Sequence, residues 1–170
     1  MKPYFLLSAL LTLLSFQAPA LANNASNTPP GRYCNPRYNF CLMYPEAVFT
    51  EKHSSSNDDG IVLMSTDRDV ILRVAGYYNI MGWSPEEEMA DFQAALQEQF
   101  NEKLELITQH STGEGLEATF KAGHITIYCL IAAQGDSFVC LEMRTNLKKK
   151  FDPSHAIPML LEDVKLEHVE

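Results

Sequence analysis

The chain has 170 residues, of which 22 are acidic and 13 are basic, so its formal net charge at pH 7 is −9. A negative charge argues against binding to nucleic acid or to an anionic membrane through a broad basic surface. The length suits one domain with a hydrophobic core of its own, and we expect a single domain.

The first residues have the three parts of a secretory signal. Lys2 supplies a positive start, residues 4–16 are almost continuously apolar, and Ala20-Leu21-Ala22 offers small residues to a signal peptidase. The apolar run is shorter than the roughly 20 residues that a membrane span needs, and no later stretch is long enough. We therefore expect a signal peptide at 1–22 and a periplasmic or secreted mature chain without a membrane span. A retained anchor or a buried helix is the alternative.

Four cysteines belong to the predicted mature chain, which fits two disulfides in an oxidising compartment. Three pairings are open, and we favour the local one, Cys34 with Cys41 and Cys129 with Cys140, because each pair flanks turn-forming residues. The spacings are wrong for the usual zinc motifs, and no C-x-x-C redox motif is present. We expect no metal at these cysteines.

The first part of the domain is predicted to be β-rich. Residues 23–32 are polar and contain Pro29-Pro30-Gly31, which predicts a flexible segment before a domain at 33–170. The apolar pattern then predicts strands at 40–44, 61–65 and 70–78. Turn residues separate the last two strands, so we expect them to form a hairpin.

One helix is clearly marked. Ser84 can cap its N-terminus, Pro85 suits the first turn, and Glu87 completes a capping box. Apolar residues at helical spacing then predict the buried face, formed by Met89, Phe92, Leu96 and Phe100.

The second part of the domain is predicted to be an antiparallel meander. Its strands are expected at 104–108, 115–121, 124–132 and 137–145, with glycine-containing breaks between them. A closing helix is predicted from the i, i+3, i+4, i+7 spacing of Ile157, Leu160, Leu161 and Val164. This order of elements predicts an α+β fold in which an antiparallel β-sheet is flanked by helices.

Three stretches carry a family resemblance. Residues 33–45 read Tyr-Cys-Asn-Pro-Arg-Tyr-Asn-Phe-Cys-Leu-Met-Tyr-Pro, and residues 59–65 and 71–79 form a glycine-led strand, an acidic turn and a glycine-bearing second strand. Phe151-Asp152-Pro153 precedes the last predicted helix. In this order the stretches resemble exported bacterial proteins with a PsbP/Mog1-like fold. The chain differs in that it has cysteines where many of those proteins carry other residues. The resemblance implies an antiparallel sheet flanked by helices and accessory, assembly, ligand-binding or partner-binding roles; enzymes are not typical.

No sequence motif predicts an active site. The histidines lack the H-E-x-x-H pattern and any i, i+4 pairing, and the sequence has neither a G-x-S-x-G elbow nor a glycine-rich phosphate loop. The histidines are His53, His110, His124, His155 and His168. We therefore expect no catalytic residue, no metal and no cofactor.

The candidate partner-binding residues cluster around the predicted helix start. Aromatic side chains are common interface anchors, and a run of three glutamates could serve as an acidic docking patch; core packing and helix N-terminal charge are the alternative interpretations. The candidates are Trp83, Tyr78, Glu86, Glu87 and Glu88.

The function expected from these features is that of a non-enzymatic periplasmic protein-binding domain. In its sharpest form it is an immunity or inhibitor protein that neutralises a secreted toxin, a basic protein that the acidic chain would attract. Two alternatives stay open: a small-ligand-binding or envelope-assembly accessory protein, and a hydrolase whose residues the sequence does not reveal.

Overall fold

The computed structural model describes residues 30–113, 115–146 and 164–168. Its elements, in chain order, are β1 (Gly31–Asn35), β2 (Phe40–Tyr44), β3 (Phe49–Ser54), β4 (Gly60–Ser65), β5 (Val70–Tyr78), α1 (Pro85–Gln99), β6 (Glu105–Ser111), β7 (Gly115–Ala122), β8 (Ile125–Gln134), β9 (Ser137–Asn146) and β10 (Lys165–His168).

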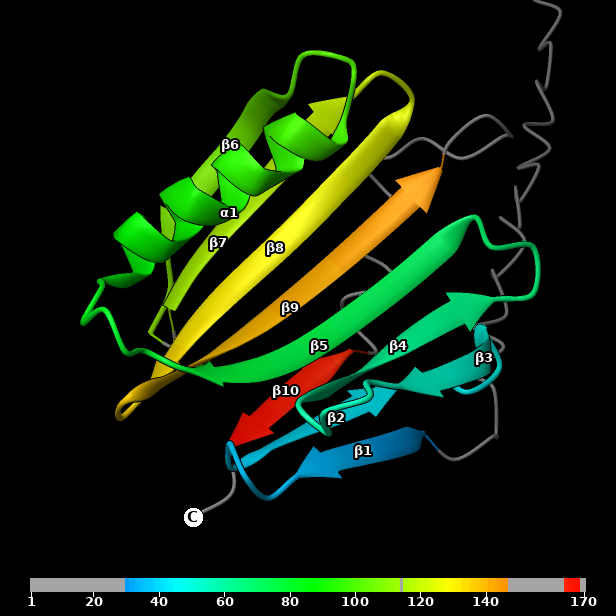
Figure 1. Ribbon diagram of the computed structural model, residues 1–170. Coiled ribbons are helices and arrows are strands. Elements are labelled where there is room, and N and C mark those ends of the chain that lie inside the picture. The colour runs from blue at the N-terminus through cyan, green and yellow to red at the C-terminus, as the bar shows by residue number, and fades with distance from the viewer. Residues whose placement is uncertain (1–29, 114, 147–163, 169–170) are drawn as a thin grey trace, which may run out of the picture.

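A seven-stranded antiparallel sheet forms the centre of the structure, in the order β3-β4-β5-β9-β8-β7-β6. Helix α1 lies on one face of this sheet, and the three-stranded sheet β1-β2-β10 lies on the other (Figure 1). The central strands are therefore buried on both faces, and this explains why β8 is almost continuously apolar.

Each central strand supplies side chains to two cores. In β9, Val139, Leu141 and Met143 pack toward β2, whereas Phe138 and Cys140 belong to the cluster beneath α1. This alternation follows from the two-residue period of a strand, in which successive side chains point to opposite faces.

Helix α1 begins as its sequence predicts. The Ser84 side chain accepts a hydrogen bond from the Glu87 backbone, and the Glu87 carboxylate accepts one from the Ser84 backbone, so the capping box is complete. Met89 and Leu96 are buried, Phe92 and Phe100 pack against the same cluster, and the helix contacts β7 and β8. The predicted buried face of the helix is confirmed.

The flanking elements differ from the prediction. One helix, α1, is described, and the second flank is the small β1-β2-β10 sheet. The predicted closing helix at 157–164 lies outside the described residues except for its last residue, Val164, which is buried and leads into β10. The α+β class with a mostly antiparallel sheet is confirmed, whereas the predicted flanking by more than one helix is not.

Three strands were not individually predicted. β1 begins at Gly31, two residues before the predicted domain boundary, while β3 and β10 carry too many exposed polar residues to show a clear alternation. Both β1 and β10 owe their place to pairing with β2, whose residues are nearly all buried. Such pairing is a tertiary effect that short polar segments do not reveal.

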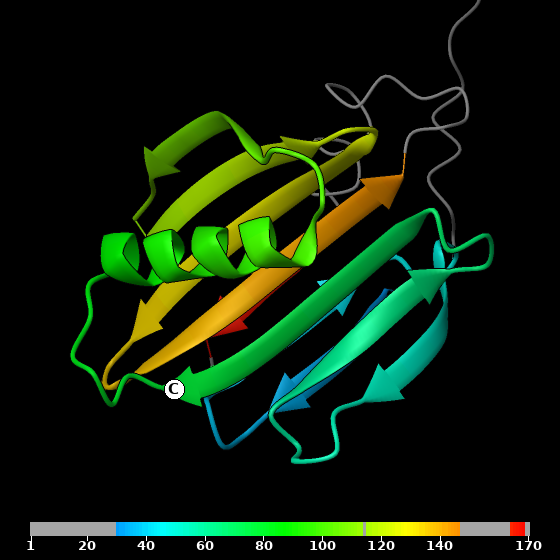
Figure 2. The same ribbon diagram turned by 45° about the horizontal axis from the view of Figure 1, so that its top comes forward.

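Helix α1 covers only part of its face of the sheet. It lies over the β7–β8 side, and no other described element lies on the part formed by β5, β4 and β3 (Figure 2). The described chain contains no helix that is both long and apolar enough to cross a membrane.

Candidate functional site

Several loops meet at the end of the sheet where β5 finishes. They are the β1–β2 turn (36–39), the β5–α1 loop (79–84) and the β8–β9 turn (135–136), which lie together at the lower left of Figure 1. Two hydrogen bonds join them: Gln134 Nε2 donates to the Asn39 carbonyl at 3.0 Å, and the Asn79 backbone N–H donates to the Asp136 carbonyl at 2.8 Å. We call this region the loop end.

The β5–α1 loop exposes two large apolar side chains. Ile80 is 87% exposed and Met81 is 66% exposed, more than any other large apolar side chain of the described residues. Gly82 follows with φ +68°, a conformation that glycine adopts without strain, and its N–H donates to the Asn79 carbonyl at 3.2 Å. We call Ile80 and Met81 the apolar tip.

Asn79 holds the base of this loop. Its side-chain amide donates to the Trp83 carbonyl and accepts from the Trp83 backbone N–H, and both distances are 2.8 Å. Because the side chain at the start of the loop is bonded to the backbone at its end, the apolar tip projects from a braced turn. Less conformational freedom is therefore lost when the tip is immobilised against a surface.

An aromatic cluster stands beside the apolar tip. Tyr78 is 48% exposed, its ring centroid lies 5.3 Å from that of Tyr38, and the Arg37 guanidinium lies over both rings at 5.1 and 5.6 Å. Gly76 permits this packing, because a Cβ there would collide with the Tyr38 ring. The sequence therefore brings one of its predicted anchors, Tyr78, to the surface.

The other predicted site residues have more local roles. Trp83 is partly buried and packs against the cluster beneath α1, so its ring is mainly a core side chain. Glu87 is used in the capping box, and Glu88 Oε1 accepts from the Tyr77 hydroxyl at 2.7 Å. Glu86 is exposed in the first helical turn.

The surroundings of the apolar tip are mostly acidic. Glu86 and Glu87 are exposed at the start of α1, and Asp136 is exposed in the neighbouring β8–β9 turn. Arg37, on the side of Tyr78, is the main positive charge among these loops. An apolar pair with acidic neighbours suits a partner surface that is apolar in its centre and basic at its rim.

Sequence reasoning missed Ile80 and Met81. A signal was available, because two consecutive large apolar residues between a strand ending at Tyr78 and a glycine at 82 are unusual in a loop, where polar residues are the norm. The predicted strand ends before Ile80 and the predicted helix begins after Met81, so neither residue was assigned to an element or to a site.

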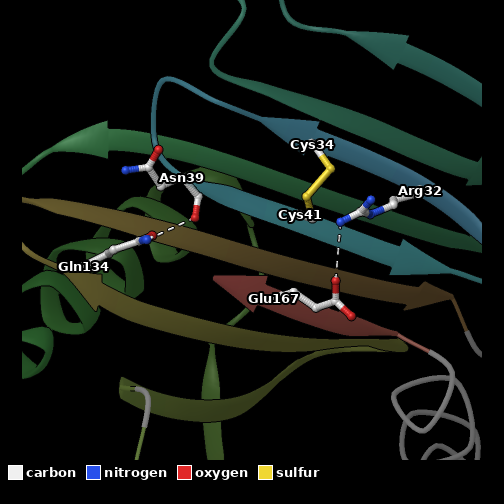
Figure 3. Close-up of a disulfide and its surroundings, with 6 residues drawn as sticks. All are labelled: Arg32, Cys34, Asn39, Cys41, Gln134 and Glu167. Atoms are coloured by element: carbon white, nitrogen blue, oxygen red, sulfur yellow. Dashed lines mark hydrogen bonds and ion pairs between the residues drawn. A yellow bond between two sulfur atoms is a disulfide. The ribbon is translucent and has the colours of Figure 1, made fainter. Parts of the chain in front are cut away.

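The first cysteine pair forms the predicted disulfide. Cys34 and Cys41 are directly paired residues of β1 and β2, and their sulfurs are bonded (Figure 3). Arg32 and Glu167 make an exposed ion pair at 3.7 Å beside it, from β1 to β10. The disulfide closes the strands that carry the β1–β2 turn and thereby supports the loop end.

The second cysteine pair is not bonded in the structure. Cys129 and Cys140 are free, with their sulfurs 3.9 Å apart. The register explains the difference from the expected pairing: Cys129 is opposite Glu142, and Cys140 is opposite Ile131, so the two cysteines are diagonal neighbours instead of direct partners.

A charged cluster lies next to these cysteines. Glu142 is buried and pairs with Arg144, and with Arg73 at 3.8 Å. Arg144 also donates to Gln99 Oε1 at 2.9 Å and lies over the Phe100 ring at 5.5 Å. These contacts tie the end of α1 to the sheet, and the arginines compensate the buried carboxylate.

The described residues do not assemble a metal centre. No three His, Cys, Asp or Glu side chains gather within residues 30–113, 115–146 and 164–168 in a way that could hold a metal. His53 and His110 each lie close to one glutamate, at 3.9 Å from Glu51 and 3.8 Å from Glu117, and both imidazoles are exposed. His155 lies outside the described residues.

Comparison with known proteins shows the fold. No protein-family model and no curated protein matches the sequence. Among solved structures, cyanobacterial PsbP (CyanoP) from Synechocystis sp. PCC 6803 superposes with a TM-score of 0.58 at 12% sequence identity, over 85% of this chain and 96% of that one. The chain has a PsbP-like fold. A crystal structure from Bacteroides thetaiotaomicron VPI-5482 also matches, with a TM-score of 0.43 at 10% identity, over 84% of this chain and 50% of that one.

Proposed function

We propose that this PsbP-like chain is a non-enzymatic, exported protein that binds a partner protein through its loop end. The observation that carries the proposal is the exposure of Ile80 and Met81 on a loop braced by Asn79. Contiguous exposed apolar side chains often mark an interaction surface, and anchors that enter a pocket supply most of the binding energy of an interface.

The charge around the apolar tip favours a basic protein over a membrane. Exposed carboxylates at Glu86, Glu87 and Asp136 repel the anionic headgroups of a bilayer, whereas they attract a partner with lysines or arginines around an apolar pocket. The net charge of −9 acts in the same direction at longer range.

In its sharper form, the proposal is that the partner is a basic secreted toxin and that this chain is its immunity or inhibitor protein. The predicted signal peptide at 1–22 and the Cys34–Cys41 disulfide support action outside the cytoplasm. A fold by itself does not imply an activity, so the PsbP-like fold is compatible with this role without requiring it.

The experiment compares two double variants as baits in periplasmic extract. Ile80→Asp with Met81→Asp changes the apolar tip, and Leu106→Asp with Ile107→Asp changes an exposed apolar pair of β6 as a matched control. A partner captured by the wild type and the β6 control, and retained at least about tenfold less by the tip variant, supports the proposal. Equal retention by both variants contradicts it.

The immunity role has its own test. The captured partner is directed to the periplasm of a sensitive host, with or without this protein. Growth arrest that the wild-type protein relieves and the tip variant does not relieve supports the toxin proposal. If the partner does not harm the host, the result contradicts the immunity function but leaves the proposed protein binding unaffected.

A further inference from the structure

Two thiols lie next to each other on the helix side of the sheet. The sulfurs of Cys129 and Cys140 are 3.9 Å apart, and both residues belong to the apolar cluster that includes Met89 and Phe92 of α1. Their side chains share a face because the β8–β9 register places each opposite a residue two positions from the other cysteine.

The distance between the sulfurs is short enough for bond formation after a small movement. A disulfide has a sulfur–sulfur distance of about 2.05 Å, so the two atoms must approach by roughly 2 Å. The register holds the two thiols at a two-residue offset on adjacent strands, with both side chains on the same face of the sheet.

The two thiols differ in accessibility. Cys129 is fully buried beneath α1, while Cys140 on β9 is partly exposed. Burial is also the main cause that raises the pKa of the Cys129 thiol, with the neighbouring Cys140 acting in the same direction. A reagent from solution therefore meets Cys140 first, because attack requires access and a thiolate.

We propose that Cys129 and Cys140 form an oxidisable pair in which Cys140 is the entry thiol and Cys129 the resolving thiol. The oxidant is an external disulfide, either glutathione disulfide or a protein disulfide. This inference does not depend on the proposed binding function.

The reaction has two exchange steps. The Cys140 thiolate attacks one sulfur of the external disulfide, forms a mixed disulfide and releases the other sulfur as a thiolate. Cys129 then gives up its proton to that base or to water and attacks Cys140 Sγ, which forms the Cys129–Cys140 bond and releases the second external thiol. Two protein thiols are oxidised, and one external disulfide is reduced to two thiols.

The test follows the reduced native protein after addition of glutathione disulfide, by acid quenching, intact mass and peptide mapping. Peptide mapping separates this pair from Cys34–Cys41. The wild type should give an internal Cys129–Cys140 disulfide without bound glutathione. Cys129→Ser should stop at glutathione on Cys140, and Cys140→Ser should react at least about tenfold more slowly.

Circular dichroism confirms that each variant is folded, and Cys129→Ala replaces the serine variant if a buried hydroxyl prevents folding. Equal reaction rates of the two single variants would overturn the assigned order. A wild type that retains glutathione at Cys140 without closing the internal bond would overturn the pair itself.

Discussion

The side chain of Asn79 and the backbone of Trp83 exchange two hydrogen bonds, each of 2.8 Å, across the loop that joins β5 to α1. One residue thus closes a turn whose outer positions, Ile80 and Met81, are both largely exposed. The apolar tip is consequently held in place by polar contacts, with few apolar contacts of its own.

Replacing Asn79 by alanine should loosen the loop. Loss of both side-chain bonds is expected to lower the free energy of unfolding by about 1–2 kcal/mol and to speed hydrogen exchange at the Trp83 amide. Asn57→Ala is the matched control, because Asn57 makes an exposed bond to Asp59 within another turn. Unchanged exchange at Trp83 in Asn79→Ala would show that the loop is braced by other contacts.

Replacing Gly76 by alanine should displace Tyr38. The added methyl group would collide with the Tyr38 ring, and overpacking of this kind typically costs about 1–3 kcal/mol. Gly113→Ala is the control, since a Cβ there meets no atom within 4 Å. Urea denaturation measures both changes; a Gly76→Ala variant as stable as the control would mean that the Tyr38 ring moves aside without cost.

Removal of the Cys34–Cys41 disulfide should destabilise the chain moderately. The loop that it closes is short, with a sequence separation of 7, so the expected loss is about 2 kcal/mol. The double variant Cys34→Ser with Cys41→Ser avoids leaving a lone thiol, and its urea midpoint is compared with that of the oxidised wild type. Identical midpoints would assign no stabilising role to this bond.

Tyr77 should make stability fall at alkaline pH. Burial is the largest cause that raises its pKa well above the usual 10.0, followed by the proximity of Cys140 and the hydrogen bond to Glu88. The unfolded chain releases this proton near pH 10 and the folded chain retains it, so the stabilisation is complete below that pH and declines above it.

The free energy of unfolding should therefore fall more steeply with pH in the wild type than in Tyr77→Phe, by up to about 1.4 kcal/mol per pH unit above roughly pH 10. Denaturation series at several pH values measure the two slopes. Parallel slopes would show that Tyr77 ionises alike in both states.

Local signals were sufficient for much of the fold. The predicted strands at 40–44 and 70–78 coincide with β2 and β5, and Ser84 caps α1 through the predicted capping box. Consecutive residues encode these elements, through alternating apolar and polar residues, turn-forming residues or helix capping. The β1 and β10 strands lack such signals, because each is ordered by pairing with β2.

The two aromatic candidates of the sequence lie in different surroundings. Tyr78 is exposed, whereas Trp83 packs into the core beneath α1. Aromatic residues occur both in hydrophobic cores and in exposed interfaces, and the neighbouring residues in the sequence do not show which of the two applies. The apolar pair Ile80 and Met81 is visible in the sequence, but its exposure depends on the direction in which the loop leaves the sheet.

By itself, the sequence determined the features that neighbouring residues encode: an acidic chain, β-rich segments and one capped helix; it favoured the Cys34–Cys41 pairing over two alternatives without deciding it. Only the tertiary structure decided which strands pair across the chain, which aromatic rings stay exposed and why Cys129 and Cys140 lie diagonally. The physical reason is that strand register and burial are set by contacts between distant segments, and a shift of two residues in register changes every partner while leaving the local pattern intact.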